Sequence, residues 1–213
     1  MNISVIVPTY KDIVDKDKIG KLFTDLRHNI QLIVSTDIDP HVGKGNAILD
    51  ALSVITEDYV VIMDADLQIS PQEVDTFFKI MQLYDADVCV GNKYHPYSSI
   101  EYPLKRKVVS WGFHVLTKVL FGLSLRDTQC GFKLFKTSVL RQIMPLLKEK
   151  RYCLDLEMLV CCKEQHIRVV EAPVNVKKQV NQGSVNLSTI WVTFWDTLKV
   201  WERKQKGAYT LSS

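Results

Sequence analysis

Residues 59–73, YVVIMDADLQISPQE, join a predicted buried strand to the start of a predicted helix. The first five residues form a short apolar run, which is typical of a strand covered on both faces of a parallel sheet. Ser70 and Glu73 have the spacing of a capping box, and Pro71 suits the first position of a helix. The apolar face of this helix is expected from Val74, Phe77, Phe78 and Met81. Residues 64–69 are therefore predicted to form a turn at the carboxyl edge of the sheet, where open α/β folds bind ligands.

Similar apolar runs recur along the chain and alternate with helical patterns. The expected strands are residues 3–7, 30–34, 59–63, 87–90, 132–135 and 167–174. Helices are expected at residues 105–121 and 154–165, with a last helix at about 188–205. This order predicts an α/β fold with a mostly parallel central sheet between two helical layers. Because no linker or repeat interrupts the pattern, we expect one domain over residues 1–213.

Composition restricts the class of protein. The 213 residues are 46% hydrophobic and 24% charged, which is typical of one globular domain. The net charge of +3 comes from 27 basic and 24 acidic residues, so no nucleic-acid partner is expected. The cysteines form no C-x-x-C pair and are odd in number, which argues against a zinc site and a disulfide framework. We expect reduced cytosolic thiols in the core at Cys89, Cys130, Cys153, Cys161 and Cys162.

Apolar segments are too short for membrane insertion. Pro8 ends the first apolar run after residues 3–7, far short of a signal-peptide core. No later stretch is long and apolar enough to span a bilayer. The expected location is therefore cytoplasmic, either in solution or on a membrane surface.

Oxygen-bearing side chains alternate in the turn that follows residues 59–63. In an extended segment Asp64, Asp66 and Gln68 point to one side, while Ala65 and Leu67 point into the fold. Such oxygens suit Mg²⁺ or Mn²⁺, which keeps further positions open for phosphate oxygens. A D-x-D alone is more often a solvated turn, so the flanking strand and helix carry this metal prediction.

Six separated motifs can be compared with a known family. They are Val7-Pro8-Thr9-Tyr10, Gly43-Lys44-Gly45-Asn46-Ala47, residues 64–68, Gly112-Phe113-His114, residues 126–135 (RDTQCGFKLF) and Asp155-Leu156-Glu157. Together they resemble family 2 glycosyltransferases of the Rossmann-like GT-A fold, in the dolichyl-phosphate glucosyltransferase and mannosyltransferase branch. The resemblance covers nearly the whole chain. Its most specific part is residues 126–135, which resemble the glucosyltransferase members almost letter for letter.

The resemblance implies an inverting, metal-dependent transfer of a hexose from a nucleotide diphosphate sugar, favoured as UDP-glucose, to a polyprenyl (dolichyl) phosphate. The implied nucleotide-sugar residues are Pro8, Thr9, Tyr10, Asp37, Lys44, Asp64, Ala65, Asp66 and Lys93. The implied residues of the acceptor phosphate and its loop are Arg106, Arg126, Gln129, Lys177 and Ser184. The implied catalytic residues are Asp155 and Asp66, and the metal ligands are Asp64, Asp66 and Gln68.

One departure from the family concerns the nucleotide side of the fold. Only a few residues separate Ser35-Thr36-Asp37 from Gly43, where family members have a further helix and strand. We therefore expect a shortened nucleotide side. The identity of the sugar donor stays open, with GDP-mannose as the alternative to UDP-glucose.

Other classes of function are weighed against this one. A nucleotidyltransferase typically has a glycine- and arginine-rich loop after its first strand, which residues 7–10 lack. A non-catalytic homologue that binds a lipid or a partner is compatible with the shortened nucleotide side. A homo-oligomer is also compatible with the sequence.

Several charged residues allow two interpretations. Lys44 between two glycines suits a phosphate contact, or it is a solvated lysine at a helix start. Asp155 and Glu157 begin a helix, where a carboxylate is often only a partner of the helix dipole. The resemblance favours Asp155 as the functional acid. A lipid phosphate would need only orientation from it, whereas a hydroxyl acceptor would need it as a base.

Aromatic residues gather on one face of the last predicted helix. At about 100° per residue, this face spans about 140°. It contains Ile190, Trp191, Phe194, Trp195, Leu198 and Trp201. A basic helix with an aromatic face is typical of a membrane interface, although the same face would also suit packing on the domain. We expect peripheral binding to the cytosolic face of a membrane.

Overall fold

A single mixed sheet organises the molecule. The computed structural model describes residues 2–10, 16–23, 28–37, 43–99, 104–150, 153–176 and 187–210. The strands are β1 (Asn2–Tyr10), β2 (Asn29–Asp37), β3 (Tyr59–Met63), β4 (Val88–Asn92), β5 (Phe132–Lys136) and β6 (Val169–Pro173). Their order is β2-β1-β3-β5-β4-β6, and β5 runs antiparallel to both of its neighbours while the other pairs are parallel. The predicted mostly parallel sheet is therefore confirmed.

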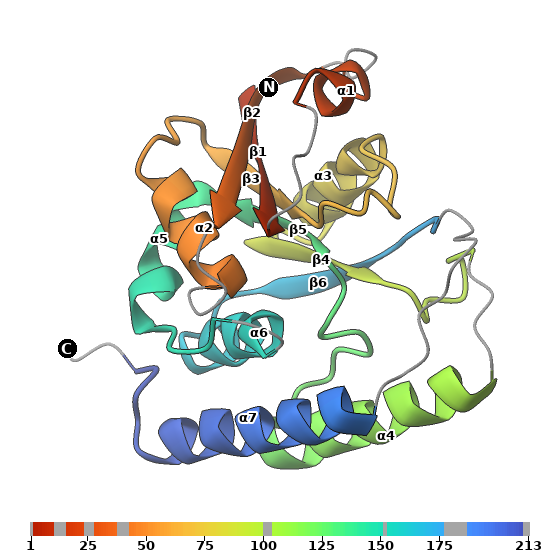
Figure 1. Ribbon diagram of the computed structural model, residues 1–213, viewed down its shortest axis with the longest axis vertical. Helices are drawn as coiled ribbons and strands as arrows, with labels where there is room; N and C mark the ends of the chain where they lie inside the picture. The colour runs from red at the N-terminus through yellow and green to blue at the C-terminus, as the bar shows by residue number, and fades with distance from the viewer. Residues whose placement is uncertain are drawn as a thin grey trace.

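Helices cover both faces of this sheet (Figure 1). On one face lie α1 (Lys16–Lys21) and α3 (Glu73–Leu83), and on the other lie α2 (Gly43–Leu52), α5 (Thr137–Ile143), the 3-10 helix η1 (Met144–Leu146) and α6 (Leu154–Glu164). In Figure 1, α4 (Leu104–Phe121) and α7 (Leu187–Gln205) are drawn beyond α6, away from the sheet. The expected three layers are thus present.

Strand β3 has the burial predicted for a strand covered on both sides. Val60 and Ile62 join the core on the α2 face, whereas Val61 and Met63 join the core on the α3 face. This division follows from the two-residue period of a strand. The five cysteines are buried and form no disulfide, as expected of core residues. Burial raises the pKa of Cys130 and Cys153 to about 12, so both thiols stay protonated at neutral pH.

The predicted capping box before α3 is wrong. The helix begins at Glu73, after Pro71, and no side chain caps it. The carboxylate of Glu73 instead accepts a hydrogen bond from Asn175 Nδ2 at 2.9 Å, and the turn is closed by Glu73 N donating to the Ser70 carbonyl at 3.0 Å. A tertiary partner has replaced the local one. The predicted apolar face is confirmed, because Val74, Phe77, Phe78 and Met81 are buried.

The nucleotide side of the sheet is short, as predicted. In the described part of the chain β2 is the edge strand, and α2 begins six residues after β2 ends. The β1 and β2 strands pair over nine positions, from Asn2 with Asn29 to Tyr10 with Asp37. They are longer than predicted because the pairing continues through polar residues, as when Asn29 Nδ2 donates to Asn2 Oδ1 at 3.0 Å.

Helix α7 exposes part of its aromatic face. The side chains of Trp191 and Trp195 are 62% and 57% exposed, whereas Thr197 and Val200 are fully buried. The alternative in which the whole aromatic face packs on the domain is therefore wrong. Among the described residues, no helix has the length and apolar character needed to cross a membrane.

Candidate active site

Two carboxylates and two lysines meet where the carboxyl end of β3 faces the starts of α2 and α6. Lys44 Nζ lies 2.9 Å from Asp64 Oδ1 and 3.1 Å from Asp155 Oδ2. Lys133 Nζ, from β5, lies 2.6 Å from Asp155 Oδ1. The Lys133 side chain is only 1% exposed. Four segments that are distant in sequence therefore form one charged cluster.

Opposite charges keep Asp155 and Lys44 of this cluster ionised. Burial acts to raise the pKa of Asp155, but Lys133 and Lys44 outweigh it and hold this pKa well below the usual range of a carboxyl group. Burial likewise acts to lower the pKa of Lys44, but Asp155 and Asp64 raise it overall. Lys44 is therefore neither a solvated lysine nor solely available for a phosphate, because its ammonium group already joins two carboxylates.

A pocket of about 220 Å³ opens beside Asp64. Its lining residues are Met63, Asp64, Asp66, Gln68, Ile69, Lys93, Gly131 and Phe132. The three predicted metal ligands and Lys93 thus share one pocket.

The conformation of residues 64–68 differs from the predicted extended segment. Leu67 has a φ of 51°, and its N–H donates to the Asp64 carbonyl at 3.2 Å, so the chain turns here. The turn brings Gln68 onto Asp66, whose carboxylate accepts hydrogen bonds from Gln68 N at 3.3 Å and from Gln68 Nε2. Ala65 and Leu67 are half-buried against the core on the α3 side. Gln68 therefore holds Asp66 in place, and its role as a metal ligand stays a prediction.

The carboxylates of Asp64 and Asp66 fit a divalent cation whose remaining ligands come from water and a bound diphosphate. Among the described residues, no group of three histidine, cysteine, aspartate or glutamate side chains is placed to hold a metal. Asp64 and Asp66 instead offer two carboxylates to an open pocket, and Mg²⁺ or Mn²⁺ commonly completes such a partial shell with water and phosphate oxygens.

Gly131 determines where the Asp64 carboxylate lies. Asp64 N donates to the Gly131 carbonyl at 3.1 Å, and a Cβ at position 131 would lie 1.7 Å from Asp64 Oδ2. We expect Gly131→Ala to displace this carboxylate and to weaken Mn²⁺-dependent binding of nucleoside diphosphate by about tenfold or more, as for a lost metal contact. Calorimetry with and without Mn²⁺ measures this change. Gly20→Ala is the matched control because nothing lies within 4 Å of its Cβ position, and equal binding by the two variants would contradict the prediction.

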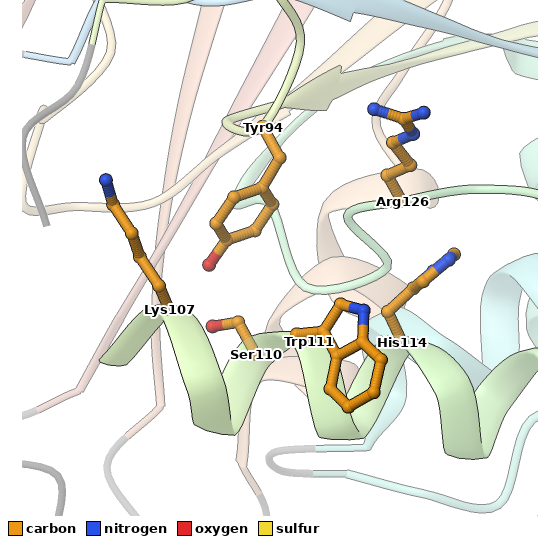
Figure 2. A pocket seen from close by; sticks show the side chains of 6 residues that line it. All are labelled: Tyr94, Lys107, Ser110, Trp111, His114 and Arg126. Atoms are coloured by element: carbon orange, nitrogen blue, oxygen red, sulfur yellow. The ribbon is translucent and has the colours of Figure 1, made fainter. Parts of the chain in front are cut away.

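A second pocket, of about 480 Å³, lies against α4 (Figure 2). It is lined by Tyr94, Lys107, Ser110, Trp111, His114 and Arg126. The consecutive residues Lys93 and Tyr94 each line one of the two pockets. Lys93 N also donates to Asp127 Oδ2 at 3.1 Å, which links this segment to the residue after Arg126.

The other predicted residues are dispersed. Thr9 is buried in β1 next to Pro8, and the register pairs Tyr10 with Asp37 at the carboxyl ends of their strands. Gln129 is exposed and lines neither pocket. Three predicted acceptor residues cannot be placed: Lys177 and Ser184 lie outside the described residues, and of Arg106 only the backbone, in α4, is described.

Residues 38–144, which are 107 of the 213, match the profile described as "Glycosyl transferase family 2". This chain belongs to glycosyl transferase family 2. It is 28% identical over 171 residues to the dolichyl-phosphate beta-glucosyltransferase of Dictyostelium discoideum, covering 75% of this chain and 51% of that protein. It is 30% identical over 147 residues to the protein of the same name from Saccharomyces cerevisiae, covering 62% and 44%. The chain thus spans about half the length of these curated relatives.

Solved structures of glycosyltransferases have the same fold. Mannosyl-3-phosphoglycerate synthase from Rubrobacter xylanophilus superposes with a TM-score of 0.65 at 15% identity, covering 100% of this chain and 76% of that one. Glucosyl-3-phosphoglycerate synthase from Mycobacterium tuberculosis, in complex with Mn²⁺, UDP-glucose and glycerol 3-phosphate, gives 0.65 at 13% identity, covering 94% and 80%. At these identities the likeness concerns the fold, and it confirms the expected GT-A class.

Two site residues of this family 2 chain were absent from the sequence prediction. Lys133 was overlooked because a lysine in a short strand usually lies at the surface, yet its neighbours Phe132 and Leu134 are fully buried. The position of Lys133 between apolar residues of a predicted strand was the sequence feature that could have indicated a buried lysine. Glu171 is the other, because its Oε1 accepts hydrogen bonds from Arg126 N at 2.7 Å and Asp127 N at 3.2 Å. No pattern along the sequence indicated that pairing.

Glu157 has a structural position, in contrast to Asp155. Its buried carboxylate accepts hydrogen bonds from Arg203 Nη1 at 2.8 Å, Tyr209 Oη at 2.6 Å and Lys148 N at 2.9 Å. All of these groups lie away from the two pockets. Asp155, which the family resemblance favours, is the carboxylate that the fold brings to Asp64.

Proposed function

We propose that this chain transfers a hexose, with glucose from UDP-glucose as the favoured donor, to a polyprenyl phosphate in a metal-dependent, inverting reaction. Family membership supports the glycosyl transfer. The two relatives named dolichyl-phosphate beta-glucosyltransferase support the lipid acceptor and the sugar. The observation that carries the acceptor class is the pairing of Asp155 with Lys44 and Lys133.

This pairing argues against an acceptor that must be deprotonated by Asp155. A carboxylate held between two ammonium groups is a poor proton acceptor, because protonation would remove both attractions. A hydroxyl acceptor needs a base, whereas a phosphate monoester is already anionic at neutral pH. The ionised Asp155 therefore suits a role in orienting Lys44 and Lys133, with a phosphate as the nucleophile.

The donor is proposed to lie in the pocket beside Asp64. Asp64 and Asp66 would hold Mg²⁺ or Mn²⁺, which supplies positive charge to the departing diphosphate. Lys93 lines the same pocket and Lys44 contacts Asp64, which supports the proposal that both contact a diphosphate oxygen. Pro8, Thr9, Tyr10 and Asp37 are proposed to serve the nucleoside from the carboxyl ends of β1 and β2.

A transfer assay tests this function. The full chain is incubated with polyprenyl phosphate, Mg²⁺ or Mn²⁺, and radiolabelled UDP-glucose or GDP-mannose. Metal-dependent label from UDP-glucose in the lipid phase is expected. Label from GDP-mannose alone would replace the proposed donor, and no label from either nucleotide sugar would favour a non-catalytic binding protein.

Peripheral binding to the cytosolic face of a membrane is proposed through α7 and α4. Trp191 and Trp195 on α7 are exposed, and Trp111 on α4 is 67% exposed. Tryptophan side chains favour the headgroup region of a bilayer, where the ring is buried while its N–H stays hydrated. This arrangement would bring the protein to a lipid acceptor.

Replacing both Trp191 and Trp195 with serine is expected to weaken binding to phospholipid vesicles by about tenfold or more. Each aromatic side chain that enters the bilayer contributes on the order of 1 kcal/mol or more to the binding free energy. Vesicle co-sedimentation measures the partition coefficient. Tyr84→Ser is the matched control, because Tyr84 is 61% exposed but follows α3 on the opposite face of the sheet. Unchanged sedimentation of the double variant would contradict membrane docking through α7.

A further inference from the structure

The second pocket has the chemistry of an anion site. Lys107, His114 and Arg126 line it together with the hydroxyl-bearing residues Tyr94 and Ser110, and none of its described lining residues is a carboxylate. Figure 2 places Lys107 and Arg126 at opposite sides, with Tyr94 between them and Ser110 and Trp111 along α4. A phosphate group would therefore find positive charge in this pocket.

His114 has a defined tautomer in this pocket. Its Nδ1 lies 3.0 Å from the carbonyl oxygen of Leu125. Because a carbonyl oxygen only accepts hydrogen bonds, Nδ1 must carry the proton. In the neutral ring Nε2 then bears a lone pair, and it is the ring nitrogen that can accept a proton.

The other residues that line the pocket of His114 would favour a negatively charged ligand. The charged or titratable residues that line the pocket with it are Lys107 from its own helix, Arg126 from the segment before β5, and Tyr94 from the loop after β4. None of them is a carboxylate that could pair with an imidazolium. A bound phosphate would supply that negative partner, and the two basic side chains would balance its second charge.

We propose that His114 is the proton acceptor for an acceptor phosphate that arrives as its monoanion. The proposal rests on the proposed function for the identity of that acceptor. The P–OH proton passes to His114 Nε2, which becomes an imidazolium, and the dianionic phosphate oxygen then forms the bond to the anomeric carbon. The bond between this carbon and the diphosphate oxygen breaks, and its electron pair leaves with the nucleoside diphosphate. The imidazolium afterwards returns its proton to solvent.

Asp155 does not compete for this role, because both of its carboxylate oxygens are engaged by Lys44 and Lys133. The consecutive residues Lys93 and Tyr94 line the donor pocket and the pocket of His114, respectively. We therefore expect a phosphate deprotonated by His114 to reach the nucleotide sugar in the donor pocket.

The protonation of a bound phosphate can be measured without any transfer. We would follow the ³¹P chemical shift of geranyl phosphate bound to the full chain, as pH is varied from 5 to 8. His114→Asn keeps an amide N–H for the Leu125 carbonyl but has no basic nitrogen. The titration midpoint of the bound phosphate is expected to be about one pH unit lower in the unchanged protein than in His114→Asn, a tenfold change in the proton equilibrium. Lys118→Ala, on α4 but outside the pocket lining, serves as the control and should keep the unchanged midpoint.

The transfer reaction provides the second readout. The acid limb of the pH profile of kcat should move to higher pH in His114→Asn. The loss of rate relative to the unchanged protein should therefore be larger at pH 6 than at pH 8, because a phosphate monoester is largely dianionic at pH 8. An equal loss at every pH, or identical ³¹P midpoints, would overturn the role of His114. Failure of the proposed function would be distinguishable, because the ³¹P difference would persist without transfer from any nucleotide sugar.

Discussion

Asp66→Ala is expected to lower metal-dependent transfer by about a thousandfold, since a metal that neutralises the leaving group contributes several kcal/mol to the transition state. Asp66 lines the donor pocket, and its carboxylate contacts Gln68 of the same turn. The free energy of unfolding should stay within about 0.5 kcal/mol, because Asp66 is exposed and packs little.

Two measurements separate these effects. Initial rates are recorded over a series of Mn²⁺ concentrations, and urea unfolding is followed by tryptophan fluorescence. Asp50→Ala is the control, because Asp50 is an exposed carboxylate on α2 outside both pockets. Undiminished transfer by Asp66→Ala at saturating Mn²⁺ would show that the metal assignment is wrong.

Asp155→Asn is expected to reduce both transfer and stability. The variant leaves the ammonium group of Lys133 buried without its carboxylate partner, which typically costs about 3 kcal/mol or more in unfolding free energy. Transfer should fall by about a hundredfold or more, since Lys44 also loses one of its two positioning contacts. Urea unfolding and the transfer assay measure the two losses.

A second variant shows whether stability alone explains the lost activity. Lys133→Met combined with Asp155→Asn removes the unpaired charge and fills a similar volume, so much of the stability should return while transfer stays low. Recovery of transfer in this double variant would exclude a role for Asp155 in the reaction.

The stability difference between Asp155→Asn and the unchanged protein should also depend on pH. The pKa of Asp155 is lower in the folded than in the unfolded chain, so its ionisation stabilises the fold above the unfolded pKa of about 3.9. This contribution is lost as the pH falls toward the lower folded pKa. The difference should therefore be constant from pH 5 to 8 and shrink below pH 4.

The sequence predicted the elements whose burial is continuous. Residues 59–63 could be recognised as β3 because each of them is apolar, and the turn after β3 follows from that strand. The conformation of this turn could not be predicted, because Leu67 adopts a positive φ that sequence patterns rarely indicate for leucine. The predicted cap of α3 was wrong for a related reason. Glu73 bonds to Asn175, which lies 102 positions away in sequence and which no local pattern indicates as its partner.

The charged cluster shows a similar limit. Asp64 and Asp155 were each predicted from separate motifs. Lys44, which contacts both, is 111 positions from Asp155 in sequence, so no local pattern indicates the contact between Lys44 and Asp155. The ion pair of Lys133 with Asp155 depends on β5 inserting antiparallel between β3 and β4. Pairings of this kind follow from topology, which local patterns leave open.

The ion pair between Arg203 and Glu157 affects the geometry of the reaction at a bilayer. Glu157 and Asp155 share the first turn of α6, and Arg203 near the end of α7 holds Glu157. The helix with the exposed Trp191 and the helix with the ionised Asp155 are thus joined by an ion pair whose carboxylate is buried. If α7 rests on the lipid surface as proposed, the sugar is transferred at a constant height above the membrane. A polyprenyl chain of any length would then present its phosphate at the same depth.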